Sequence, residues 1–223
     1  MGFFWIYLYG LTHTVSRYVP DPFHLPNGMT APAMMLYLLA LLLWLLRTGR
    51  GLLIGLHRPA RLASTEIIRL FPLLVLPVCN LLHTKQPFAS WDTLVILLCA
   101  AVAEELLFRG WLLTRLLSRP ITAVCLTSAV FALLHTVNFS NTASLQPVLL
   151  QMLCAFCFGL SCGAVTLRLK SLLPAICAHV LVNLTGASAL LPFHAVAACI
   201  AIYIIHGVLL CRSLCPNQKE KQL

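Results

Sequence analysis

Seven apolar runs, separated by short polar or proline-containing breaks, dominate this 223-residue sequence. A helix needs about 20 mostly apolar residues to cross a bilayer, so each run is a candidate membrane span. Residues 2–16 form an eighth, weaker candidate that would span the membrane, lie at its surface or act as an uncleaved signal-anchor. The pattern predicts an all-α, polytopic transmembrane bundle of seven or eight helices in one integral membrane domain, 1–223. The seven runs lie at 31–46, 67–82, 91–114, 120–137, 147–167, 171–187 and 194–211.

The composition and charge support this class of protein. Hydrophobic residues make up 60% of the chain and charged residues 9%, whereas an average soluble domain has about 25% charged residues. An ordinary soluble enzyme is therefore excluded. A net charge of +9 would suggest a nucleic-acid partner in a soluble protein. Here the bases lie mainly between the apolar runs, so we expect a lipid bilayer as the surrounding partner and no nucleic acid.

The distribution of basic residues predicts how the chain is oriented. Bases are frequent at 47–69, 115–119 and 168–170 and in the tail after 211, while the intervening loops carry only Lys85. Loops rich in Lys and Arg stay on the cytoplasmic side of a membrane. We therefore expect the basic loops and the C-terminus to be cytoplasmic.

Two adjacent carboxyl groups, Glu104 and Glu105, lie in the middle of the apolar run 91–114. One ionised side chain at this depth costs about 2.5–3.5 kcal/mol. Arg109 is four residues beyond Glu105, which places the two on one helix face and predicts an ion pair. Glu104 is rotated by about 100° from Glu105 and has no partner in its own helix. A purely structural interpretation is that Glu105 forms an ion pair with Arg109 while Glu104 stays protonated. A functional interpretation is that Glu104 takes part in a site.

Polar side chains in two later runs favour the functional interpretation. His135 lies about as far from the turn near Arg119 as Glu104 does, roughly 22 Å at a rise of 1.5 Å per residue. His179 and Asn183 are one helical turn apart on the same face of their run. A lone histidine in an apolar helix is usually structural, but four polar groups at similar depth on three helices predict a buried site.

Three short motifs in this order, on successive predicted helices, resemble the CPBP family of intramembrane proteases, which includes CAAX-prenyl proteases and bacteriocin-processing enzymes. The resemblance covers about 104–183, within a predicted catalytic helix core of 91–187. The motifs are EExxxR at Glu104, Glu105 and Arg109, FxxxH at Phe131 and His135, and HxxxN at His179 and Asn183.

The resemblance implies an endopeptidase that hydrolyses a peptide bond in a membrane-associated protein or peptide. The substrate would be a prenylated CAAX protein, a leader peptide or a protein with a short sorting tag. The small size of the chain suits an enzyme of the plasma (inner) membrane of a bacterium. The implied roles are general base for Glu104, water positioning for His135, oxyanion stabilisation for His179 and Asn183, and support for Glu105, Arg109 and Phe131.

Metal dependence and two other functions remain as alternatives. Glu104, His135 and His179 are residue types that bind zinc, but the chain lacks HExxH, so we expect no cofactor and keep zinc as the alternative. A proton- or cation-coupled transporter would use the same side chains as a relay. It would also show inverted repeats or paired broken helices, and neither is clear. A non-catalytic membrane scaffold would be expected to lose one of the catalytic residue types, yet all are present.

Overall fold

A computed structural model describes residues 30–48, 64–83, 91–136, 145–186 and 191–214. Within these ranges the chain is helical and contains no strand. The predicted segment 2–16 lies outside the described residues. The elements are α2 (Thr30–Thr48), α3 (Ser64–Ile68), η2 (Phe71–Leu74), α4 (Val75–His83), α5 (Trp91–Glu105), η3 (Leu106–Leu112), α6 (Leu113–Arg115), α7 (Pro120–Leu134), α8 (Leu145–Leu169), α9 (Leu173–Thr185) and α10 (Phe193–Leu214).

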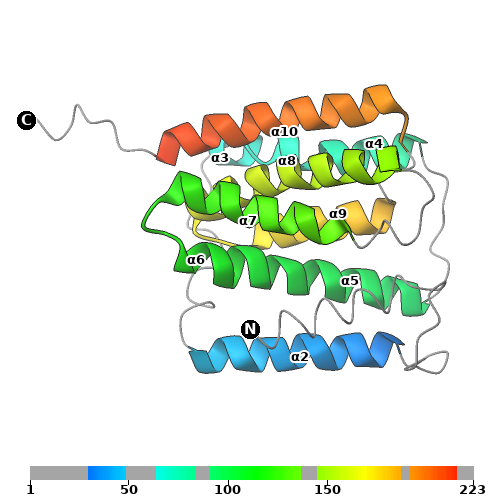
Figure 1. Ribbon diagram of the computed structural model, residues 1–223, viewed down its shortest axis with the longest axis vertical. Coiled ribbons are helices and arrows are strands. Elements are labelled where there is room, and N and C mark those ends of the chain that lie inside the picture. Colours follow the sequence, from blue (N-terminus) through cyan, green and yellow to red (C-terminus); the bar gives the residue numbers. More distant parts are fainter. Residues whose placement is uncertain (1–29, 49–63, 84–90, 137–144, 187–190, 215–223) are drawn as a thin grey trace, which may run out of the picture.

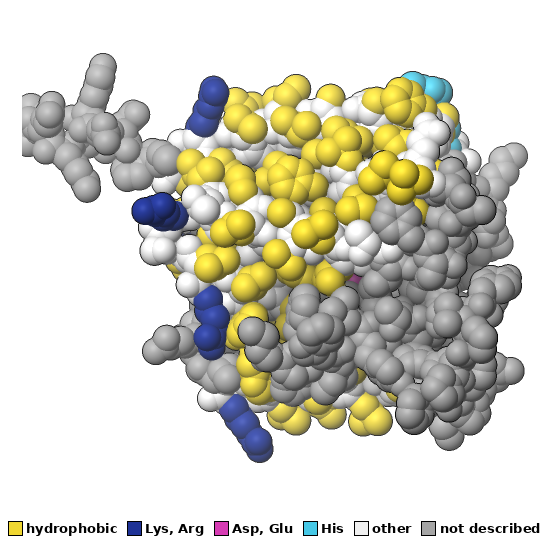
Figure 2. Space-filling model, viewed as in Figure 1, with side chains coloured by type: hydrophobic (Ala, Val, Ile, Leu, Met, Phe, Trp, Pro, Cys, Tyr) yellow, Lys and Arg dark blue, Asp and Glu magenta, His cyan; other side chains and the backbone are white. Residues whose placement is uncertain are grey.

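Each of the seven apolar runs forms helix, which confirms the predicted all-α membrane bundle. Three helical stretches are long and apolar enough to cross a membrane by length and composition: Thr65–His83, Leu145–Leu169 and Phe193–Leu214. The helices lie side by side, with α2 at one edge and α10 at the other (Figure 1). In Figure 2 the Lys and Arg side chains gather at the end of the bundle where α10 finishes, and hydrophobic side chains cover the region beyond them.

The central helix of the bundle is α8, which packs against α7 on one side and α10 on another. Helix α9 packs on α5 and α4, and α2 packs on α5. Small buried residues on α8, including Gly159, Ser161 and Gly163, let its neighbours approach closely, as is usual where helices associate in membranes. Of the three motif-bearing helices, α7 and α9 contact α8, and α5 joins them through its packing on α9.

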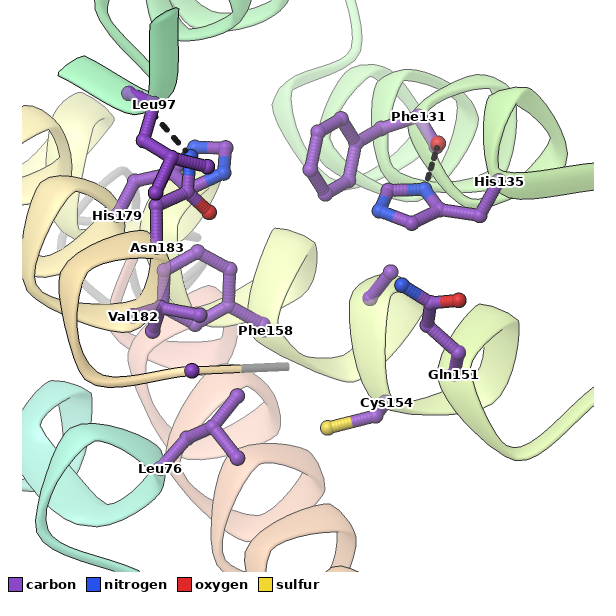
Figure 3. Close-up of a pocket in the computed structure, with 12 residues that line it drawn as sticks. Leu76, Leu97, Phe131, His135, Gln151, Cys154, Phe158, His179, Val182 and Asn183 are labelled. Carbon is purple, nitrogen blue, oxygen red and sulfur yellow. Dashed lines mark hydrogen bonds between the residues drawn. The ribbon is translucent and has the colours of Figure 1, made fainter. Parts of the chain in front are cut away.

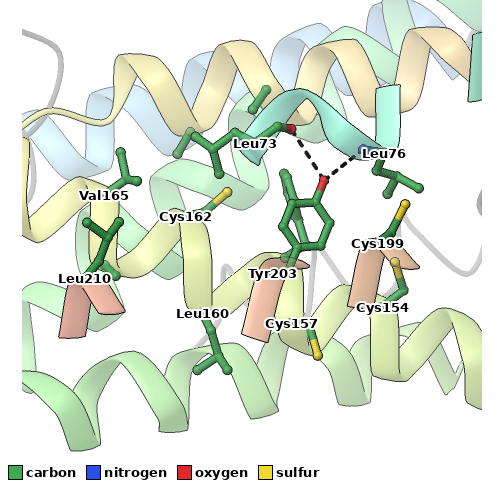
Figure 4. Packing of buried hydrophobic residues seen from close by; sticks show 14 of the residues in the cluster. Leu73, Leu76, Cys154, Cys157, Leu160, Cys162, Val165, Cys199, Tyr203 and Leu210 are labelled. Carbon is green, nitrogen blue, oxygen red and sulfur yellow. Dashed lines mark hydrogen bonds between the residues drawn. The ribbon is translucent and has the colours of Figure 1, made fainter. Parts of the chain in front are cut away.

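The run 67–82 is predicted as one helix, but the structure breaks it into α3, η2 and α4. Pro77 has no N–H to donate to the carbonyl of Leu73. The Tyr203 hydroxyl of α10 donates to that carbonyl at 3.4 Å and accepts from the Leu76 N–H at 3.2 Å (Figure 4). The hydroxyl thus satisfies two backbone groups that the break would leave unpaired in an apolar core.

The run 91–114 is also predicted as one helix, and it contains a change of helix type. Helix α5 ends at Glu105 and continues as a π-helix, η3, before α6. Such segments are rare and occur often at functional sites. This one begins directly after the two carboxyl groups and contains Arg109, so it sets the position of the guanidinium relative to both.

Candidate active site

The predicted ion pair between Glu105 and Arg109 is present and fully buried. Arg109 Nη1 donates to Glu105 Oε1 at 2.8 Å, and both side chains are 0% exposed. The guanidinium also lies 4.5 Å from the centre of the Phe131 ring of α7. Next to it, a Cβ added to Gly159 of α8 would come within 3.1 Å of Arg109 Nη2. The absence of a side chain at Gly159 therefore makes room for the guanidinium.

His179 joins α9 to both carboxyl groups of α5. Its Nδ1 lies 2.8 Å from Glu105 Oε1, and its Nε2 lies 3.5 Å from Glu104 Oε2. A carboxylate only accepts hydrogen bonds, so Glu105 fixes Nδ1 of the imidazole as the protonated nitrogen. The rings of Phe131 and Phe158 hold the imidazole edge-on, each with its centre 5.7 Å away.

Glu104 is 9% exposed and lies at the meeting point of several helices. Besides contacting His179, it is close enough to His135 of α7 and to Tyr37 of α2 to interact with them electrostatically. No sequence pattern singles out Tyr37, because its apolar run contributes no motif. Its position shows that a helix outside the motif region also contacts the site.

His135 and Asn183 are each oriented by a backbone carbonyl. His135 follows the last residue of α7, and its Nδ1 donates to the Phe131 carbonyl at 3.0 Å. In the neutral ring this leaves a lone pair on Nε2. Asn183 Nδ2 donates to the Leu97 carbonyl of α5 at 3.2 Å. The amide group has two hydrogens, so one remains for a ligand.

These residues surround a cavity of about 180 Å³. Figure 3 shows His179 and Asn183 on one side of it and His135 on the other. Glu104 is not among the residues that line the cavity, and it connects to this space through its contact with His179. The lining residues are Leu76, Leu97, Phe131, His135, Gln151, Cys154, Ala155, Phe158, His179, Val182, Asn183 and Gly186.

The cavity also includes residues of α8 that the sequence motifs do not contain. Gln151 precedes Cys154 and Ala155 by three and four residues, and Phe158 follows them at the same spacings, so the four side chains form one face of this helix. The only available signal was a glutamine amide within an apolar run, since polar groups at membrane depth tend to be functional. The motifs gave no indication that α8 would complete the cavity, because they lie on α5, α7 and α9.

The donor groups do not have the arrangement of a metal centre. In the part of the chain that the structure describes, no cluster of three or more His, Cys, Asp or Glu side chains is placed to hold a metal ion. Both nitrogens of His179 face carboxyl groups, and Nδ1 of His135 faces a backbone carbonyl. Among the described residues, the alternative zinc ligands Glu104, His135 and His179 are therefore not grouped as a three-residue metal cluster.

Comparison with protein families identifies the motif-bearing part of the chain. Residues 86–185 match the family model of the Rce1-like type II CAAX prenyl endopeptidases. This match is consistent with the CPBP family that the three motifs resemble. The matched segment contains all three motifs and the helices α5 to α9. Comparison with curated proteins and with solved structures gives no match.

The family match supports a CAAX-type intramembrane endopeptidase in general. It implies a membrane-associated protein substrate. The apolar helices are consistent with the membrane location.

Proposed function

We propose that the chain is an intramembrane endopeptidase in which Glu104 activates the attacking water. One observation carries this proposal: His135, His179 and Asn183 of the family-matched segment line one cavity, and Glu104 contacts His179 beside it. Glu104 lies 3.5 Å from His179, and His179, His135 and Asn183 all line the cavity.

The proposal uses His179 as an imidazolium, the form of the ring that has an N–H on both nitrogens. His179 then donates from Nδ1 to Glu105 at 2.8 Å and has an N–H on Nε2 for a second acceptor.

The proposed reaction begins when Glu104 takes a proton from a water molecule whose other hydrogen is accepted by His135 Nε2. The resulting hydroxide adds to the carbonyl carbon of the substrate. The oxyanion accepts hydrogen bonds from His179 Nε2–H and from the second amide hydrogen of Asn183. A donor of this kind is worth about 3–4 kcal/mol of transition-state stabilisation. Glu104 then gives its proton to the leaving nitrogen, the C–N bond breaks, and a carboxyl group and an amine are formed.

The proposed location is the plasma membrane of a bacterium, with the C-terminus in the cytoplasm. Its support is the gathering of Lys and Arg side chains at the end of the bundle where α10 finishes (Figure 2), because basic segments remain on the cytoplasmic side. The proposed substrate is a prenylated CAAX protein, a leader peptide or a protein with a short sorting tag. Hydrolysis by this route uses no cofactor.

The test is cleavage of a membrane-tethered peptide library by the purified wild type and the Glu104→Gln variant, with and without a strong chelator. We expect the wild type to cut with or without chelator and Glu104→Gln to lose cleavage. Glu66→Gln is the matched control, because Glu66 pairs with Arg168 at the basic end of the bundle, away from the cavity. Turnover retained by Glu104→Gln refutes the general-base role. If the chelator abolishes cleavage by the wild type and added zinc restores it, the same side chains are assigned to a metal site.

A further inference from the structure

We propose that Gln151 binds the main chain of the substrate beside the bond that is cut. This inference rests on the proposed protease function and adds a substrate-binding residue from α8, a helix that carries none of the three motifs. Figure 3 shows the Gln151 side chain extending from α8 on the same side of the cavity as His135, opposite His179 and Asn183.

Gln151 is one of the residues that line the cavity, and its neighbours on α8 line it as well. Cys154, Ala155 and Phe158 continue the same face of α8 and also line the cavity. Cys154 and Phe158 are buried, and Phe158 packs against the His179 ring. Gln151 is thus the polar group on an otherwise apolar face that ends at the catalytic histidine.

The chemistry of an amide fits a peptide main chain. A glutamine side chain has two N–H donors and an oxygen with two lone pairs, so it can bind a ligand in addition to a partner within the protein. A peptide that enters a membrane site must have its own N–H and C=O groups satisfied, because lipid offers them no partner. With the carbonyl of the scissile bond directed at His179 and Asn183, an adjacent peptide group on the other side of the cavity meets Gln151.

The main-chain contact predicts a specific kinetic change. In Gln151→Met the side chain keeps nearly the same length and volume but loses the amide. We expect KM for a cleaved peptide to rise about 2- to 13-fold, the factor for one neutral hydrogen bond, with kcat nearly unchanged. Gln146→Met is the matched control, because Gln146 lies on the first turn of the same helix and is exposed.

The experiment uses a peptide that the wild type cleaves from the tethered library, and a series of versions N-methylated at single main-chain nitrogens or with single amides replaced by esters. One of these replacements is expected to weaken cleavage by the wild type and by Gln146→Met. The same replacement should have no further effect on cleavage by Gln151→Met.

If Gln151→Met lowers kcat and thermal stability and leaves KM unchanged, Gln151 has a structural role and the inference is overturned. An unchanged KM in Gln151→Met together with lost activity in Glu104→Gln refutes the main-chain contact while the proposed function stands. If the wild type cleaves no peptide, both are refuted.

Discussion

Removal of the buried guanidinium is the perturbation whose effect the structure defines best. Arg109→Met keeps a long apolar side chain but removes the guanidinium that lies 2.8 Å from Glu105, whose side chain is 0% exposed and keeps only its 2.8 Å contact with His179 Nδ1. Breaking a buried pair in this way costs about 3–5 kcal/mol. The cation–π contact with Phe131 at 4.5 Å is part of what is lost, and such a contact is worth roughly 0.5–2 kcal/mol. Total stabilities are about 5–15 kcal/mol, so the loss is a large share.

The assay is the free energy of unfolding in mixed micelles, measured for Arg109→Met and for a matched control. Arg115→Met is that control, because Arg115 is exposed and its guanidinium lies over Trp111 at 4.8 Å. We expect it to lose less than about 1 kcal/mol, as exposed cation–π contacts do. The double variant Glu105→Gln/Arg109→Met removes the stranded charge, so it should be more stable than Arg109→Met. Wild-type stability in Arg109→Met, or a double variant no better than the single one, refutes the argument from a buried charge.

Three further substitutions test how the fold supports the site. Tyr203→Phe removes the hydroxyl that hydrogen-bonds the backbone at the break before α4, so the free energy of unfolding should fall by about 1–3 kcal/mol. An unchanged melting temperature contradicts this. Gly159→Ala places a Cβ 3.1 Å from Arg109 Nη2, so the free energy of unfolding should fall by about 1–3 kcal/mol and the rate of peptide cleavage should fall too. Full cleavage activity would show that the guanidinium has room to move. Asn80→Leu removes the 2.7 Å hydrogen bond from the Asn80 amide to the Gly186 carbonyl at the end of α9. Both the free energy of unfolding and the rate of cleavage should fall. Normal cleavage kinetics in this variant would show that α9 is held by its other contacts.

Several features of the site follow from spacing along single helices and were predicted on that basis. The ion pair between Glu105 and Arg109 depends on a separation of four residues, which places two side chains on one face in any regular helix. Even the π-helix at this point leaves the pair intact. The predicted common depth of Glu104 and His135 likewise follows from counting residues at a fixed rise from the turn near Arg119.

Helix type and continuity were predicted less well, because they depend on contacts between helices. The break in the run 67–82 persists because Tyr203, more than a hundred residues later, satisfies the free backbone groups. The π-helix places Arg109 between Glu105, the Phe131 ring and the space left by Gly159. No local pattern indicates either partner.

The sequence by itself determined that the chain forms a bundle of apolar helices and that buried carboxyl, imidazole and amide groups lie at one level in it. Hydropathy and helical periodicity are local properties, and they fix which residues are buried in lipid or protein and at what depth. Only the tertiary structure decided that His179 contacts both glutamates, that Gln151 lies across the cavity from Asn183, and that Glu104 is not among the lining residues. These relations depend on the rotation of each helix about its axis and on which helices are neighbours, and both are set by side-chain packing across the whole bundle.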